Sequence, residues 1–129
     1  MALAKGASTT VLSNKTAAAA GSTTTSECTT IDTDACTDLS LTVKLTYGSA
    51  ATLVPTIKIW ASEDDTNWDT EVYESYDFPK CTASGTLKWS FDIGHGPRYL
   101  KVQVTNNETA DANKDITAIY VYTHKQAVA

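Results

Sequence analysis

The strongest constraint on the fold is a strict two-residue alternation that begins at residue 39. Between Leu39 and Tyr47 every second side chain is apolar, and the side chains between them are Ser, Thr or Lys. Successive side chains of a β-strand point to opposite faces of a sheet, so this alternation predicts a strand with one buried face. A second clean alternation runs from Leu87 to Ile93, and no helical periodicity competes with either.

Six segments after residue 38 carry strand signals, separated by turn residues. The expected strands span residues 39–47, 57–61, 72–78, 87–93, 99–105 and 116–123. The last of them is apolar on both faces, which predicts either a central strand or a strand in an interface. Short strands at regular spacing predict an all-β fold of two packed antiparallel sheets, a β-sandwich of jelly-roll type.

The first 38 residues differ in composition, because Ala, Ser, Thr and Gly dominate them. Such a segment has too few large apolar groups to build a core of its own. We expect an extended Ala/Ser/Thr-rich N-terminal arm or edge strands over residues 1–38, and a β-sandwich domain over residues 39–129. We further expect the arm to gain order beside a neighbouring protein, where it can add a strand to an exposed sheet edge.

The charge balance argues against two classes of partner. Ten Lys and Arg face fifteen Asp and Glu, a formal charge of −5, which disfavours binding to nucleic acid phosphates or to an anionic membrane. No stretch approaches the ~20 apolar residues of a spanning helix, and no signal-peptide core follows Met1. We therefore expect a chain made in the cytosol, with neither nucleic acid nor membrane as its partner.

Catalytic residues are not expected. His95 lies in a Gly-rich connection and His124 lies near the C-terminus, and neither accompanies a Ser or Cys motif that a base could activate. Three cysteines are too few for a disulfide scaffold, so reduced thiols are expected. A bridge between Cys28 and Cys36 is the alternative, because a protein made in the cytosol can be oxidised later outside the cell.

An acidic stretch between two expected strands is the best candidate for a metal site. Calcium prefers several oxygens from one flexible loop, but this stretch lacks the spacing and the Gly of an EF-hand loop. We expect a solvated hairpin tip, with no metal and no cofactor, and keep a calcium site as the alternative. The oxygen-bearing residues of the stretch are Glu63, Asp64, Asp65, Asn67 and Asp69.

Aromatic residues surround the same hairpin and raise the possibility of sugar binding. By alternation, Trp60 faces away from Ile57 and Ile59, which places its ring on an outer face. Exposed aromatic rings act as contacts to proteins or as platforms for sugar rings. A carbohydrate-binding module is therefore an alternative reading of Trp60, Trp68, Tyr73 and Tyr76.

Two stretches of the chain carry a recurrent pattern. The first runs from Trp60 to Phe78 and contains the hairpin sequence Asp-Asp-Thr-Asn-Trp. The second runs from Gly96 to Asn106 and contains the sequence Pro-Arg-Tyr. In both stretches the chain resembles small structural proteins of tailed-bacteriophage particles, in which a strand, an acidic Thr-Asn-Trp hairpin and a later Pro-Arg-Tyr strand sit in a β-sandwich. In size, in acidity and in lacking catalytic residues, the chain resembles capsid decoration or cement proteins in particular.

This resemblance implies a non-enzymatic protein of the virion, made in the host cytoplasm. It implies binding to the major capsid protein at subunit junctions or to other virion proteins, as a homo-oligomer, with a trimer favoured. A tail, adaptor or fibre-attachment protein and a carbohydrate-binding β-sandwich module are the alternatives. The residues expected to contact other proteins are Leu3, Val11, Leu12, Trp60, Asp64, Asp65, Trp68, Tyr120 and Tyr122.

Overall fold

The computed structural model describes residues 3–5, 8–49, 51–109 and 114–128, and strands dominate these ranges. A single-turn 3-10 helix, η1 (Thr25–Glu27), precedes the third strand. The strands are β1 (Leu3–Lys5), β2 (Thr9–Ala17), β3 (Ile31–Asp32), β4 (Cys36–Tyr47), β5 (Thr56–Ser62), β6 (Glu74–Asp77), β7 (Gly85–Asp92), β8 (Tyr99–Thr105) and β9 (Ile116–Val128). Each of the six strands expected after residue 38 is present, although β4 and β9 are longer than expected and β6 is shorter.

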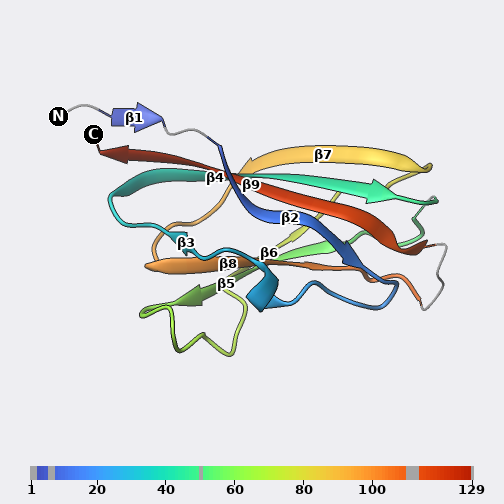
Figure 1. The fold of residues 1–129 in the computed structure, drawn as a ribbon, viewed down its shortest axis with the longest axis horizontal. Coiled ribbons are helices and arrows are strands. Elements are labelled where there is room, and N and C mark those ends of the chain that lie inside the picture. Colours follow the sequence, from blue (N-terminus) through green and yellow to red (C-terminus); the bar gives the residue numbers. More distant parts are fainter. Residues whose placement is uncertain (1–2, 6–7, 50, 110–113, 129) are drawn as a thin grey trace.

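The described strands form two antiparallel sheets that pack face to face (Figure 1). In sheet A the order is β9, β4, β7, and both β1 and β2 pair with the free side of β9. In sheet B the order is β3, β8, β5, β6. The pairs β2·β9, β3·β8, β4·β7 and β5·β6 are nested in sequence, which is the pairing of a jelly roll. The predicted all-β sandwich is confirmed.

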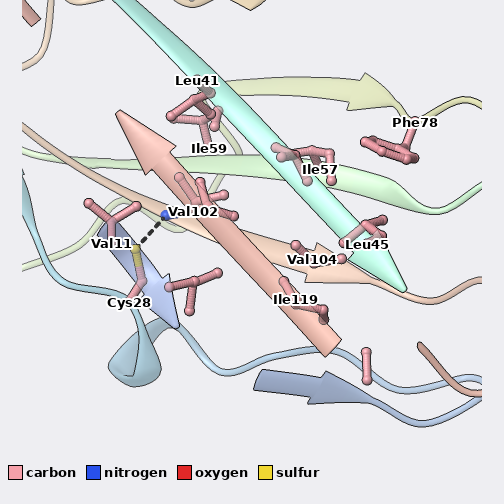
Figure 2. Close-up of a cluster of buried hydrophobic side chains, with 14 of the residues drawn as sticks. Val11, Cys28, Leu41, Leu45, Ile57, Ile59, Phe78, Val102, Val104 and Ile119 are labelled. Carbon is pink, nitrogen blue, oxygen red and sulfur yellow. Dashed lines mark hydrogen bonds between the residues drawn. The ribbon is translucent and has the colours of Figure 1, made fainter. Parts of the chain in front are cut away.

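The core lies between the inner faces of the two sheets. Figure 2 shows Leu41 and Leu45 of β4 and Ile119 of β9 on one side, with Ile57 and Ile59 of β5 among the residues opposite. All five side chains are fully buried. They are the apolar members of the alternating segments, so the period-two pattern and the buried face coincide. The last strand, β9, is central, since it pairs with β4 on one side and with β1 and β2 on the other.

Cys28 belongs to this core and is held by a backbone hydrogen bond. The Val102 N–H donates to its Sγ at 3.2 Å, the dashed line in Figure 2. Burial raises the pKa of the Cys28 thiol to about 11, so the thiol stays protonated at neutral pH. Cys28, Cys36 and Cys81 are all unpaired in the structure, and the alternative of a Cys28–Cys36 bridge is not adopted.

Residues 9–32 lie on the edges of this sandwich and contribute to its core. Strand β2 buries Val11 and Leu12, and β3 buries Ile31 beside Leu100. Two consecutive buried residues break the period of two, because the pairing of β2 with β9 shifts register at three places and Asn14 adopts a φ of 49°. This part of the chain packs on its own sandwich, contrary to the expectation that it gains order only beside a neighbour.

Replacing Leu12 tests how firmly β2 belongs to the sandwich. Leu12 is 1 % exposed, so Leu12→Ala should lower the free energy of unfolding of the isolated chain by about 2–5 kcal/mol. The exposed neighbour in the same strand gives a matched control, and Ser13→Ala should stay within about 0.5 kcal/mol of the wild type. Urea unfolding followed by tryptophan fluorescence measures both. Equal stability of the two variants would show that residues 9–17 do not pack on the isolated chain.

Candidate functional site

Within the described ranges, the structure offers no arrangement of three or more His, Cys, Asp or Glu side chains suited to a metal ion. No helix in these ranges is long and apolar enough to cross a membrane. The candidate binding surfaces are the outer faces of the two sheets and the connection between β5 and β6.

The outer face of sheet A carries a row of two lysines and a tyrosine. Lys44 of β4 lies directly opposite Lys88 of β7 and, on its other side, opposite Tyr120 of β9. The Lys44 Nζ lies 4.5 Å from the centre of the Tyr120 ring, a cation–π contact. The Tyr120 and Tyr122 rings stack with their centres 6.2 Å apart. Amino groups and aromatic rings are thus gathered at the middle of this face.

The pairing of Lys44 with Lys88 is electrostatically unfavourable in the isolated chain, because like charges directly opposite each other destabilise a sheet. Neither lysine is in an ion pair within the described residues. By register, the nearest carboxylate in the strands of this face is Asp92, four residues beyond Lys88 and so about 13 Å along the strand. A depression of about 320 Å³ lies beside the pair, lined by Ser8, Thr42, Lys44, Lys88, Tyr122 and His124.

The outer face of sheet B carries the two tryptophans expected to make contacts. The Trp60 Nε1–H donates to Gln103 Oε1 at 2.9 Å, which fixes the indole over the sheet. The Lys101 Nζ lies 4.8 Å from the centre of the Trp68 ring. A depression of about 240 Å³ is lined by Thr25, Trp60, Trp68 and Asp69. Two aromatic rings and a carboxylate therefore border one hollow.

The tight turn at Asp64 shapes the start of the β5–β6 connection. The Asp64 carboxylate accepts hydrogen bonds from the backbone N–H groups of Thr66 at 3.0 Å and Asn67 at 2.8 Å, and from the Asn67 side chain at 2.9 Å. These bonds hold the pKa of the Asp64 carboxyl far below its ordinary value, the bonds from Asn67 most strongly. Buried Ser62 donates to the Asn67 carbonyl at 2.7 Å. Asp64 therefore has a structural task within the turn.

A second carboxylate, which sequence reasoning missed, organises the loops at the other end of the sandwich. Glu108 is 3 % exposed and accepts from the backbone N–H groups of Thr52 at 2.5 Å and Leu53 at 2.8 Å. The pKa of Glu108 is lowered, because these hydrogen bonds outweigh the opposing effect of its burial. An isolated Glu in a polar stretch gives no sequence signal of this role.

The structure separates the expected contact residues into groups. Trp60 and Trp68 border one hollow on sheet B, whereas Tyr120 and Tyr122 stack on the outer face of sheet A. The backbone of Leu3 in β1 pairs with that of Val128 in β9. The side chain of Leu3 is not among the parts of the chain that the structure describes.

The expectation that Val11 and Leu12 contact a partner needs correction. Their side chains are 4 % and 1 % exposed, because β2 turns them into the core against the inner faces of the sheets. Asp65 is exposed at the hairpin tip, has a φ of 60° and accepts a hydrogen bond from Thr30 Oγ1 at 3.0 Å. Asp65 is thus accessible at the surface, and Val11 and Leu12 are not.

The Lys44–Lys88 pair was not among the predicted contacts. Alternation alone places both lysines on the outer side of their strands, since Val43, Leu45 and the other apolar residues face inward. Two properties of the tertiary structure bring the two lysines together. The strand order sets β4 beside β7, and the register sets residue 44 opposite residue 88. The sequence therefore indicates that each lysine points outward, but it does not indicate that the two lysines are neighbours.

Comparisons with known proteins bear on the fold. No protein-family model matches the chain, and no curated protein matches it. Among solved structures, the chain is similar to the SPBc2 prophage-derived protein YomS, with a TM-score of 0.51 and 15 % identity over 98 % of this chain and 96 % of that chain.

Two further solved structures are less similar. One comes from Bacillus endospore appendages, described as a family of disulfide-linked pili, with a TM-score of 0.36 and 17 % identity over 99 % of this chain and 88 % of that chain. The other is the coat protein of tobacco streak virus, with a TM-score of 0.36 and 13 % identity over 98 % and 88 %. The similarity to the prophage-derived protein is the one that supports the sandwich fold over the length of the chain.

The structure predicts an unusual titration of Asp64. Its carboxyl should titrate well below the ordinary Asp pKa of about 3.9. Because the folded pKa is depressed, the turn gains stability from the charged form above the unfolded pKa, and loses it as the pH falls through the folded pKa. NMR titration of the side-chain carbonyl, with the Thr66 and Asn67 amides as reporters, measures this. The amide transitions should vanish in Asp64→Asn, and an ordinary Asp64 pKa would contradict the assigned bonds.

Proposed function

We propose that the chain is a structural protein of a phage particle that acts by binding other proteins and not by catalysis. The observation that carries the proposal is the similarity to the prophage-derived protein, which extends over 98 % of this chain and 96 % of the other. A likeness of that extent involves both sheets and their connections, and not one common hairpin. Because that protein derives from a prophage, the similarity is consistent with a role of this chain in a phage particle.

The outer faces of the sandwich support a role in protein contact. Tyrosine and tryptophan are enriched where proteins bind one another, because a large rigid ring gives much contact area at a small entropic cost. Tyr120 and Tyr122 lie on the outer face of sheet A, and Trp60 and Trp68 lie on that of sheet B. The sandwich therefore presents aromatic contact groups in two opposite directions.

Within this class, we propose that the chain decorates the capsid and binds the major capsid protein at subunit junctions. Strand β7 supports this, because it ends sheet A and its eight residues have no further strand partner within the described ranges. Such an edge offers unpaired N–H and C=O groups to which an extended segment of a capsid protein can add as a strand. The bound state would combine this edge with one of the two aromatic faces.

Copy number in the particle tests the decoration proposal. A protein that binds at repeated capsid junctions should be present in numbers comparable to the major capsid protein. Quantitative mass spectrometry of purified particles of the phage that encodes the chain measures the ratio. A few copies per particle would instead indicate a tail, adaptor or fibre-attachment protein. Absence from the particle would contradict the proposal as a whole.

The hollow between Trp60 and Trp68 favours one second candidate, a carbohydrate-binding module. Binding hollows combine apolar ring surface with a few polar groups that fix orientation. Here two indoles supply the ring surface, and Thr25 and Asp69 supply a hydroxyl and a carboxylate. A sugar ring presents an apolar face and hydroxyl groups, so it matches both features.

Native electrophoresis through gels that contain a bacterial surface polysaccharide tests the second candidate. If sugar binding occurs at this hollow, the polysaccharide should retard the wild-type chain, and Trp68→Ala should abolish most of the retardation. Tyr73→Ala gives a matched control, because Tyr73 is an exposed aromatic residue outside the hollow. Unretarded migration of the wild type would remove this candidate, and equal retardation of both variants would place the sugar elsewhere.

A further inference from the structure

The Lys44–Lys88 pair marks a surface where two positive charges have no ion-pair partner among the described residues. Two amino groups face each other across β4 and β7, and the strand on the far side of β9, β2, contains no acidic residue. The depression beside the pair is lined by hydroxyl, imidazole and amino groups and by no carboxylate. In a chain with a net charge of −5, such a face is complementary to carboxylates brought by another molecule.

The same chain carries a group of exposed carboxylates on its other sheet. Glu63, Asp69 and Glu71 are exposed in the connection between β5 and β6, and none of them is in an ion pair within the described residues. Tyr73, at the end of the connection, is 39 % exposed and is one of the two most exposed large apolar side chains described. The connection therefore offers negative charge together with an aromatic ring.

These two surfaces cannot meet within one chain. The outer face of sheet A points away from sheet B, whereas the β5–β6 connection extends from sheet B on the opposite side of the sandwich (Figure 1). A contact between them must join two copies through two different surfaces, which is a heterologous contact. Such contacts form a closed ring when the rotation between copies closes, and an open chain of copies when it does not.

We infer that the acidic β5–β6 connection of one copy docks on the Lys44–Lys88 face of a second copy. Carboxylates of the connection accept hydrogen bonds from the two lysines and remove their mutual repulsion. Exposed ion pairs are weak individually, so contact area must contribute as well. Tyr120, Tyr122 and the incoming Tyr73 supply that area as rigid aromatic surface. The inference goes beyond the proposed function, because contact between copies does not require a particle.

Charge reversal on each surface tests the inference. Analytical ultracentrifugation of the wild type should show species heavier than the 13.8 kDa monomer, at lower abundance in about 1 M than in about 0.15 M salt, because salt screens the pairs. Lys44→Glu/Lys88→Glu and Asp69→Lys/Glu71→Lys should each be monomeric on their own. An equimolar mixture of the two variants should associate again, since each supplies the surface that complements the other. Circular dichroism confirms that both variants fold.

A matched control separates this contact from a general effect of charge. Lys58→Glu/Lys80→Glu makes the same change in net charge at two residues outside the strands of sheet A and should associate like the wild type. A wild type that stays monomeric up to millimolar concentration overturns the inference, as does a mixture of folded variants that stays monomeric. Reversal at Lys44 and Lys88 that abolishes particle binding but leaves association intact also overturns it, since the face would then bind a different protein. Copy number in particles is independent of these outcomes.

Discussion

The register of β4 between β7 and β9 is the constraint on which the rest of the structure depends. Because side chains alternate along a strand, burial of Leu41, Val43 and Leu45 sends Thr42, Lys44 and Thr46 to the outer face. A slip by one residue would exchange the two sets and bury lysine, so the core specifies the register strongly. The same register places Lys44 opposite Lys88 and Tyr120. The composition of the outer face is thus a consequence of core packing.

Most of the sandwich could be predicted from the sequence, because the signal that specifies it is local. Alternation in Leu39–Tyr47 and Leu87–Ile93 gives strand type and buried face from neighbouring residues alone, and both segments pack as expected. The apolar character of β9 on both faces predicted either a central strand or a strand in an interface, and in the structure the strand is central. Strand order is less local, yet short strands at regular spacing suffice to suggest the jelly roll, and the nested pairs realise it.

The features that could not be predicted arise where tertiary pairing overrides the local pattern. Val11 and Leu12 are consecutive, so a regular strand would expose one of them, and only the register shifts against β9 bury both. Glu108 is buried because the backbone N–H groups of Thr52 and Leu53, more than fifty residues away, converge on its carboxylate. Of the contact surfaces, Trp60 followed from alternation, while the lysine pair required knowledge of which strands are neighbours.

The distribution of charge also explains why net charge is a poor guide to contacts at short range. A folded chain of 129 residues has a radius of gyration of about 14 Å. The repulsion between the net charges of −5 on two copies therefore acts between centres that are more than about 14 Å apart. The Debye length at physiological salt is about 8 Å, so this repulsion is largely screened. Carboxylates within hydrogen-bond reach of Lys44 and Lys88 lie well inside that length. At contact, the local lysine pair therefore outweighs the net charge, and an acidic chain can bind an acidic segment of its own kind.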